Sequence, residues 1–359
     1  MIRRIPTRLP SPFLMALVLC SALGSLPANA TGIPALERPA IQTAKARNTV
    51  LLDIARAGER LVAVGERGIV LLSDDAGATW RQARVPVSVS LTAVQFVDAE
   101  RGWAVGHMGV VLHSRDGGET WSKQLDGVRA AQLALDDARQ HVHAPDGEKR
   151  VKDAEWLVKD GPDKPFLALY FKNRDEGYVV GAYNLIFRTR DGGASWQPWL
   201  RHLDNPESLN LYAIRAAGGR LYIAGERGLL LRAEADGDRF EALESPYDGS
   251  YFGLLGMPSG ELVAYGLRGH AYWSGDRGDT WSPIETGLET TFSSATPLHD
   301  GELLLASQAG ELLLSQDRGR TFQPAGAGGA SVAGIVQAPD GSLVSVGLGG
   351  VARPSTAQR

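Results

Sequence analysis

Residues 61–80 read LVAVGERGIVLLSDDAGATW, and this stretch decides the fold. Its two apolar runs, 61–64 and 69–72, are separated by a short turn, 65–68, that begins and ends with glycine. A second turn, 73–79, follows and is rich in small and acidic residues. Short apolar runs bounded by glycine-containing turns predict β-strands joined by hairpins. The stretch therefore predicts the two central strands of an antiparallel unit.

The same unit recurs along the chain, with an aromatic residue at the end of its second turn. These residues are Trp80, Trp121, Trp196, Phe240, Trp281 and Phe322. They lie 41 to 44 residues apart, except that 75 residues separate the second from the third. Runs at 50–54 and 80–85 supply outer strands, so each unit has four. Four-stranded repeats of this length are typical of propeller blades, which bury their faces against one another.

The second strand of the unit can be recognised seven times. The seven copies start at Leu61, Trp103, Tyr178, Leu221, Leu262, Leu303 and Leu343. The sequence therefore predicts an all-β protein, a single seven-bladed β-propeller formed by residues 31–359. The last blade lacks its final strand. Residues 33–46 have no place in the first blade, and we expect them to supply the missing outer strand and close the ring.

An insertion between blades 2 and 3 explains the longer spacing. Residues 123–165 contain apolar residues at helical spacing in two runs, separated by the turn Ala144–Gly147. We expect a helical hairpin that stands over one face of the propeller. His141 and His143 lie within it, but the sequence offers them no third ligand, so no metal site is predicted.

The N-terminus has the features of a signal peptide. A basic start is followed by the apolar run 13–23 and by Ala28-Asn29-Ala30, which predicts cleavage of residues 1–30. The run is too short for a comfortable membrane-spanning helix. Cys20 does not follow a small residue, so no lipid attachment is predicted. We expect a periplasmic or secreted monomer with no membrane segment after cleavage.

The charge balance limits the possible partners. The chain has 37 Lys and Arg against 41 Asp and Glu, a net charge of −4. A negative net charge argues against general binding to nucleic acid, whose phosphates attract basic proteins.

The second turn of the unit follows the pattern Ser-x-Asp-x-Gly-x-Thr-Trp, the Asp-box. Its aspartates are Asp75, Asp116, Asp191, Asp276 and Asp317, whereas the fourth copy has lost the acid. An aspartate can accept backbone N–H groups of its own turn, and glycine permits a positive φ. Because one ring would not need five copies of a catalytic group, we interpret these residues as structural and predict no catalytic residue among them.

The segments 106–121 and 181–196, each ending in an Asp-box, resemble the photosystem II stability/assembly factor family and its bacterial relatives. The resemblance covers about residues 45–350. It implies an exported seven-bladed propeller that works without a cofactor and binds or helps to assemble a membrane-protein complex. The expected partner is thus a protein of a membrane or envelope complex.

The alternative is a glycan-binding protein or a glycosidase, because sialidases also carry Asp-boxes. The Arg-Ile-Pro motif of sialidases occurs here only at 4–6, within the predicted leader. Glu66 and Glu226 are candidate carboxylates, but they belong to blades 1 and 4, and a glycosidase needs its two carboxylates within about 10 Å. We therefore expect no enzyme activity.

The turns between the second and third strands offer a candidate binding face. These turns lie together on the side of a propeller opposite the Asp-boxes. They carry Arg67, His107, Tyr183, Arg227 and Arg268. Arginine presents a rigid fork that matches carboxylates and is enriched at interface hot spots. We expect these residues to bind the protein partner.

Overall fold

The computed structural model describes residues 32–233, 238–327 and 329–354. The predicted leader, with Cys20, and part of the fourth repeat's second turn lie outside these ranges. The contacts between residues divide the chain into two units, and the second unit, which begins at Pro34, contains all the helices and strands named below. Among the described residues, no helix is long and apolar enough to cross a membrane.

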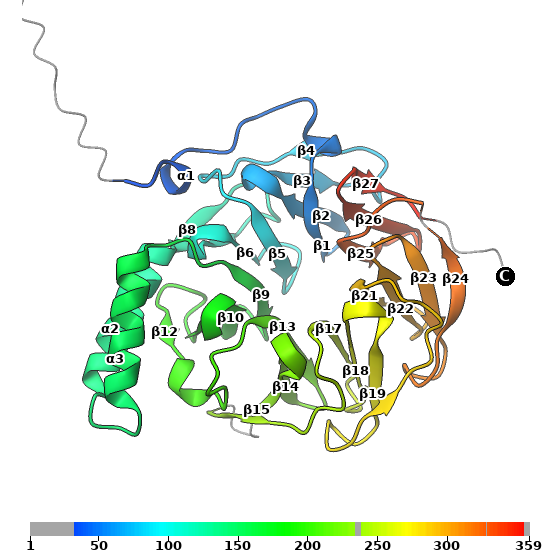
Figure 1. The fold of residues 1–359 in the computed structure, drawn as a ribbon. Coiled ribbons are helices and arrows are strands. Elements are labelled where there is room, and N and C mark those ends of the chain that lie inside the picture. The colour runs from blue at the N-terminus through cyan, green and yellow to red at the C-terminus, as the bar shows by residue number, and fades with distance from the viewer. Residues whose placement is uncertain (1–31, 234–237, 328, 355–359) are drawn as a thin grey trace, which may run out of the picture. The chain divides into compact units, whose positions relative to one another are not determined.

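In the described part of the chain, seven antiparallel sheets follow one another in sequence order and are numbered sheets 1 to 7 (Figure 1). The first three have four strands each: β1 (Leu51–Ala57), β2 (Arg60–Gly65), β3 (Val70–Ser73) and β4 (Arg81–Gln82); β5 (Leu91–Phe96), β6 (Gly102–Gly106), β7 (Val111–Ser114) and β8 (Ser122–Leu125); β9 (Phe166–Phe171), β10 (Gly177–Gly181), β11 (Ile186–Thr189) and β12 (Gln197–Pro198).

Sheets 4 to 6 also have four strands, and sheet 7 has three. Their strands are β13 (Leu211–Ala217), β14 (Arg220–Gly225), β15 (Leu230–Ala233) and β16 (Phe240–Ala242); β17 (Tyr251–Gly256), β18 (Leu262–Gly266), β19 (Ala271–Ser274) and β20 (Ser282–Pro283); β21 (Phe292–Pro297), β22 (Leu303–Ser307), β23 (Glu311–Ser315) and β24 (Gln323–Ala327); and β25 (Gly334–Gln337), β26 (Leu343–Gly347) and β27 (Gly350–Ala352).

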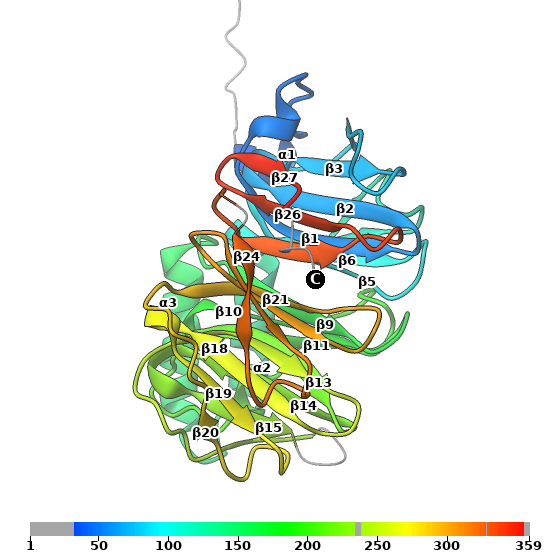
Figure 2. The ribbon, with the colours of Figure 1, turned by 90° about the vertical axis from the view of Figure 1, so that its right-hand side faces the viewer.

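The sheets form a closed ring. The first strand of each sheet contacts the first strand of the next, and β25 in turn contacts β1. Figure 2 shows the C-terminal strands β26 and β27 beside β1 and β2. Apolar side chains fill the spaces between sheets, as where fully buried Trp103 stacks on Phe171 of the next sheet with ring centroids 3.7 Å apart. Each sheet thus buries its faces against its neighbours.

The order of the strands sorts the turns to two ends of the sheets. Turns between the second and third strands, together with the connections to the next sheet, lie at one end, named here the turn face. Five of these turns are short 3-10 turns: η2 (Glu66–Gly68), η3 (His107–Gly109), η4 (Ala182–Asn184), η6 (Glu226–Gly228) and η7 (Leu267–Gly269). The first hairpins and the Asp-boxes lie at the other end, the Asp-box face.

Each of the five predicted Asp-box aspartates holds its own turn together. Asp75 accepts hydrogen bonds from the Thr79 N–H at 2.8 Å and from the hydroxyls of Thr79 and Ser73 at 2.6 and 2.8 Å. The Ser73 hydroxyl in turn accepts the Gly77 N–H at 2.8 Å. The same contacts recur around Asp116, Asp191, Asp276 and Asp317. These bonds, led by that of the Thr79 hydroxyl, lower the pKa of Asp75 to about 2.

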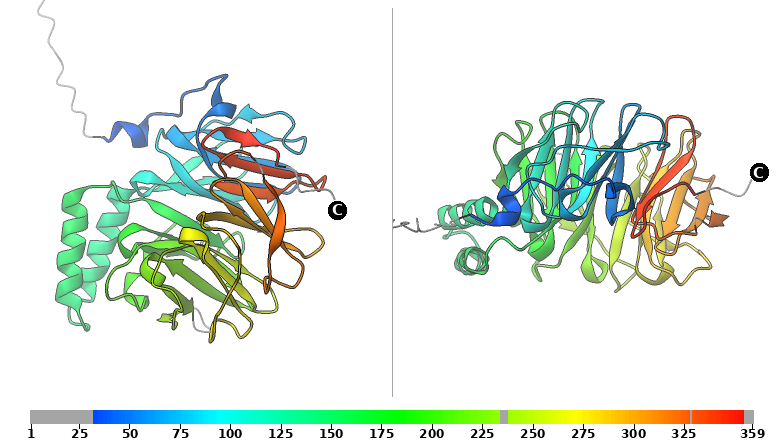
Figure 3. Two further views of the ribbon diagram at one scale, coloured as in Figure 1. Left: turned by 45° about the vertical axis from the view of Figure 1, so that its right-hand side comes forward. Right: turned by 90° about the horizontal axis from the view of Figure 1, so that it is seen from above.

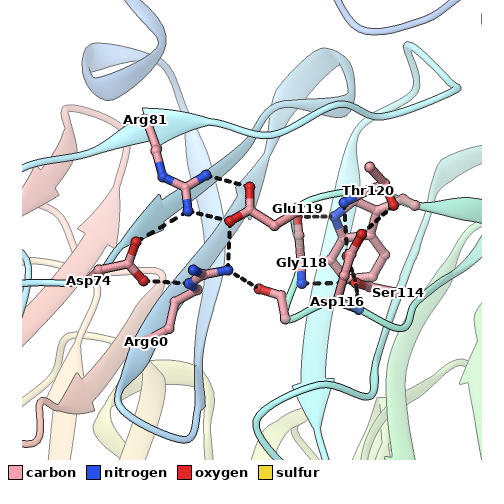
Figure 4. Close-up of polar contacts among 10 residues, drawn as sticks. Arg60, Asp74, Arg81, Ser114, Asp116, Gly118, Glu119 and Thr120 are labelled. Atoms are coloured by element: carbon pink, nitrogen blue, oxygen red, sulfur yellow. Dashed lines mark hydrogen bonds and ion pairs between the residues drawn. The ribbon is translucent and has the colours of Figure 1, made fainter.

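Charged residues join neighbouring Asp-boxes on the surface. Arg60 and Arg81 of sheet 1 each form ion pairs with Asp74 and with Glu119 of sheet 2, at 2.5 to 3.2 Å (Figure 4). This network links the first two boxes, next to the hydrogen bonds of Asp116.

The insertion forms two helices, α2 (Gly127–Gln140) and α3 (Gly147–Asp160), which pack against each other. The expected position over the face is wrong, because α2 contacts η3 and the outermost strand β12. Ala130 and Ala134 of α2 belong to the apolar cluster between sheets 2 and 3. Figures 1 and 3 accordingly show the hairpin outside the ring. Small side chains let the helix lie against the outer edge of the sheets.

Residues 34–48 do not form the expected outer strand of sheet 7. They contain helix α1 (Pro34–Glu37) and the 3-10 turn η1 (Ala46–Asn48). The segment instead follows the strand-like connection after sheet 1, where the Ala40 N–H donates to the Val85 carbonyl at 3.0 Å. Within this segment, η1 packs against β27. Pro34 and Pro39 lack the N–H groups that a ladder strand needs, and the segment pairs irregularly.

Candidate functional site

The turns of the turn face share an unusual backbone conformation in sheets 1 to 5. Their second residue has a positive φ although it is not glycine: 53° at Arg67, 58° at Met108, 55° at Tyr183, 51° at Arg227 and 56° at Arg268. In this left-handed region a side chain costs roughly 1 kcal/mol or more. Glycine would avoid that cost, so these five positions keep large side chains at some expense of stability.

Contacts to the next sheet hold these turns in place. The N–H of the second turn residue donates to a side chain just before the first strand of the following sheet. The pairs are Arg67 to Ser90 Oγ at 3.4 Å, Tyr183 to Asn210 Oδ1 at 2.8 Å, Arg227 to Ser250 Oγ at 3.4 Å and Arg268 to Thr291 Oγ1 at 3.2 Å. Proline occupies the corresponding place after sheet 2. Each exposed side chain therefore starts from a backbone fixed to two sheets.

All five predicted partner-binding residues lie on the turn face and are exposed. Arg67, His107, Tyr183, Arg227 and Arg268 come from five consecutive sheets. Tyr183 is 64% exposed, unusually much for an aromatic side chain. Within the described residues, no hydrogen bond or ion pair is found between any two of the five. They form a row of separate contact points rather than one cluster.

Neighbours from the inter-sheet connections complete this row, and the repeat pattern did not reveal them. Lys164 places its Nζ 5.4 Å from the centre of the Tyr183 ring. Glu207 forms an exposed ion pair with Arg227 at 2.7 Å. The Tyr247 hydroxyl donates to the carbonyl of residue 267, next to Arg268, at 3.2 Å. These connections differ in length and sequence from repeat to repeat, so no alignment assigns them a position.

Glu66 and Glu226 have the same role in their two turns. The Glu66 carboxylate accepts the N–H of Val50 at 3.4 Å, and that of Glu226 accepts the N–H of Asn210 at 3.2 Å. Val50 and Asn210 directly precede the first strands of their own sheets. Both glutamates therefore close the turn onto the innermost strand, in agreement with their near-identical Gly-Glu-Arg-Gly sequences.

Asp53 on the innermost strand β1 is a candidate that the sequence reasoning missed. Its position in the strand holds small residues in the other six sheets: Ala93, Ala168, Ala213, Gly253, Ser294 and Gly334. The Asp53 carboxylate accepts the N–H of Val94 in sheet 2 at 2.9 Å, just as Ser294 Oγ accepts the N–H of Ile335 in sheet 7 at 3.1 Å. An alignment of the innermost strands would have shown this exception.

Burial changes the acidity of Asp53. It raises the pKa of this carboxyl to about 6, against the opposing effects of the Val94 and Ile54 N–H groups and of the Arg215 charge. Burial also raises the pKa of Tyr265 on β18 to about 12. The charges of Arg215 and Asp53 act on Tyr265 as well. These three groups, from sheets 1, 4 and 5, therefore influence one another electrostatically.

The ring of antiparallel sheets defines the class of the protein as a β-propeller. Its fold resembles the WD40 β-propeller domain of Doa1, with a TM-score of 0.61 and 10% identity over 90% of this chain and 97% of that chain. The family model of photosynthesis system II assembly factor YCF48 matches residues 37–133 and 149–346. Because this match covers most of the chain, the protein belongs to that family.

Individual relatives agree with this assignment. Over 101 residues the chain is 31% identical to "Photosystem II assembly lipoprotein Ycf48" of Synechococcus sp. (strain CC9902). This match spans 27% of the chain and only 30% of that relative's length. Two solved structures share the fold. The first, "YCF48 bound to D1 peptide", has a TM-score of 0.61 and 19% identity, and the match covers 91% of this chain and 100% of that chain. The second, "YCF48 from Cyanidioschyzon merolae", has a TM-score of 0.60 and 15% identity, and the match covers 86% of this chain and 96% of that chain.

Proposed function

We propose that this protein is an exported, non-catalytic accessory factor that binds a protein of a membrane or envelope complex through its turn face. The seven sheets act as the seven blades of a rigid scaffold. The observation that carries the proposal is the row of exposed Arg and Tyr side chains held at positive φ on turns fixed to two sheets. Strained backbone that the surrounding structure maintains is concentrated at functional sites.

The family supports a protein partner rather than a small substrate. The family is named for an assembly factor, and one solved relative is described as bound to a D1 peptide. For this chain the partner is defined only by the chemistry of the turn face. Three arginines favour a segment with carboxylates, because guanidinium and carboxylate groups pair through two parallel hydrogen bonds. Tyr183 adds a large apolar contact next to them.

The ion pair between Arg227 and Glu207 suggests how an acidic segment would enter. Both side chains are exposed, with 65% and 60% of their surface accessible. An exposed ion pair contributes only about 0–1 kcal/mol. A carboxylate of the partner can therefore take the place of Glu207 at small cost. Fixed turns add to affinity because little backbone order is lost on binding.

The cellular setting is part of the same proposal. Residues 1–30 would direct export and be removed, which would place the chain in the periplasm or outside the cell as a monomer. The negative net charge of the chain agrees with a partner other than nucleic acid. The helical hairpin, on which Trp156 is exposed, would flank the bound partner beyond sheet 3.

Affinity capture from detergent-solubilised envelopes tests the proposal. The triple variant Arg67→Ala/Arg227→Ala/Arg268→Ala should lose the partner that the wild type retains. A matched variant, Arg115→Ala/Arg190→Ala/Arg318→Ala, removes three exposed arginines from the Asp-box face and should retain it. Equal recovery of the same partner by both triple variants would contradict the assignment of the turn face.

A further inference from the structure

Tyr265 on β18 departs from the pattern of the second strands. It pairs with Gly253 on the innermost strand β17. A Cβ on Gly253 would lie 2.1 Å from the Tyr265 hydroxyl, so the tyrosine fits because glycine stands opposite it. Its hydroxyl therefore reaches the innermost strand. At the same register position the other six sheets have only Val or Ala: Val64, Val105, Val180, Ala224, Ala306 and Val346.

The Tyr265 hydroxyl is a buried polar group without a partner. The residue is only 5% exposed, and among the described residues no group forms a hydrogen bond with its hydroxyl. In the corresponding places the Asp53 carboxylate and the Ser294 hydroxyl each accept an N–H of the next sheet. Burial raises the pKa of Tyr265 to about 12, so the hydroxyl keeps its proton and can donate. Buried polar groups normally have a partner, and this one is open to a ligand.

Arg215 on the innermost strand β13 is a second exception. Gln95 has the same register position in sheet 2, two residues after the small residue of its strand, and exchanges two hydrogen bonds with the backbone of Phe171 in the next sheet, at 2.8 and 2.9 Å. Arg215 is exposed instead, and its guanidinium donates to the carbonyl of its neighbour Ile214 at 2.9 Å. Within the described ranges it forms no ion pair. Its charge is therefore available on the inner side of the ring.

The Arg215 charge and the Tyr265 hydroxyl lie on neighbouring sheets. The innermost strands β13 and β17 of sheets 4 and 5 contact each other. The charge of Arg215 acts on the pKa of Tyr265 and also on that of Asp53 in sheet 1, which is not a neighbour of sheet 4. Both effects agree with a guanidinium that extends toward the axis of the ring. A guanidinium and a phenol hydroxyl are together suited to a carboxylate, which accepts hydrogen bonds from both.

Two aromatic side chains adjoin this pair toward the turn face. Tyr212 of β13 and Phe252 of β17 each lie where their strand skips one position of the ladder, and their ring centroids are 5.4 Å apart. Both are partly exposed. The corresponding Thr92 and Ser293 use their hydroxyls to bond the backbone of the next sheet. The aromatic pair instead offers an apolar surface, three residues or roughly 10 Å along the strand from Arg215.

We propose that a small organic carboxylate with an apolar tail binds on the inner side of the ring between sheets 4 and 5. Its carboxylate pairs with the guanidinium of Arg215 and accepts a hydrogen bond from the hydroxyl of Tyr265. Its tail packs against Tyr212 and Phe252. A few placed polar groups beside an apolar surface are typical of ligand sites. This site goes beyond the proposed binding of a protein partner and does not use the arginines of the turns.

The probe is 3-phenylpropanoate, and 3-phenylpropanamide is its uncharged counterpart of the same shape. Isothermal titration calorimetry is performed at about pH 5.5, where Asp53, with a pKa of about 6, is mostly neutral and the probe is still ionised. The wild type should bind the carboxylate saturably at millimolar concentration or below. The amide should bind at least tenfold more weakly. Octanoate should bind as well, and acetate, which lacks a tail, at least tenfold more weakly than octanoate.

Two substitutions remove the polar groups and keep the shape of the site. Arg215→Met retains the length of an exposed side chain, and Tyr265→Phe retains the ring opposite Gly253. Arg215→Met should weaken the binding of 3-phenylpropanoate tenfold or more, and Tyr265→Phe severalfold, with the melting temperature unchanged. Arg115→Met removes an exposed arginine from the Asp-box face and should bind the probe as the wild type does.

Three results would overturn the proposal. The first is the absence of saturable binding for both 3-phenylpropanoate and octanoate. The second is equal affinity of wild type and Arg215→Met, or an equal loss in Arg115→Met. The third is binding of a peptide with a free C-terminus by a protein that binds neither small carboxylate, because the site would then take the end of a protein chain.

Discussion

Asp53 gives the fold a pH dependence opposite to that of most carboxylates. Its pKa is about 6 in the folded protein against 3.8 in an unfolded chain. Between these values the folded state binds more protons, so the free energy of unfolding falls as the pH rises through 6. At about 1.4 kcal/mol for each unit of pKa difference, the free energy of unfolding changes by at most about 3 kcal/mol in total. The stabilisation is complete below about pH 4 and is lost above about pH 7.

Asp53→Asn removes the charge and keeps a carbonyl oxygen for the Val94 N–H. As the pH rises from 4 to 8, we expect the free energy of unfolding of the variant to increase by up to about 3 kcal/mol relative to that of the wild type. The amide loses one of the two acceptor oxygens, which lowers its stability by about 1 kcal/mol at every pH. The difference between the two pH values is therefore the diagnostic quantity, and urea unfolding followed by tryptophan fluorescence measures it.

Ser294→Ala is the matched control, because Ser294 holds the next sheet in the same way without a charge. It should destabilise the protein by about 1 kcal/mol at all pH values. If the stability difference between Asp53→Asn and wild type is constant from pH 4 to pH 8, the assignment of a raised pKa to Asp53 is refuted.

Two further experiments test the Asp-box face. Asp276→Ala should lower the free energy of unfolding by about 1–3 kcal/mol, because the N–H and the hydroxyl of Thr280 lose their acceptor. Calorimetry at pH 7 measures this loss. A loss below about 0.3 kcal/mol would show that the turn is stable without the aspartate. Arg60→Ala and Glu119→Ala should each lower the free energy of unfolding by no more than about 1 kcal/mol. Their coupling in a double-mutant cycle should shrink between 0.05 and 1 M salt, because the pair lies at the surface, partly exposed, where salt screens it; a coupling insensitive to salt would contradict this.

The sheets could be predicted well from the sequence because the residues that end the strands recur in every repeat. Each turn of the first unit, such as Gly65–Gly68, recurs at the same distance from Trp or Phe, so the strands between them follow. The hydrogen bonds of Asp75 agree with the interpretation of the acid as a structural residue. The helical spacing also located α2 and α3 within the insertion.

The sequence failed where a segment occurs only once. Residues 33–46 have no second copy to compare, and their pairing with the connection after sheet 1 depends on irregular backbone contacts. The helical pattern of the insertion identifies an apolar side but not the surface that covers it.

Site-specific photo-crosslinking in living cells tests the central claim most directly, since it reports which face meets the partner. A photoreactive phenylalanine derivative in place of Tyr183 probes the turn face, and one in place of Arg190 probes the Asp-box face of the same sheet. We predict an adduct with an envelope or membrane protein from position 183 that disappears in the Arg67→Ala/Arg227→Ala/Arg268→Ala background. An adduct with that protein from position 190 but none from position 183 would contradict the account.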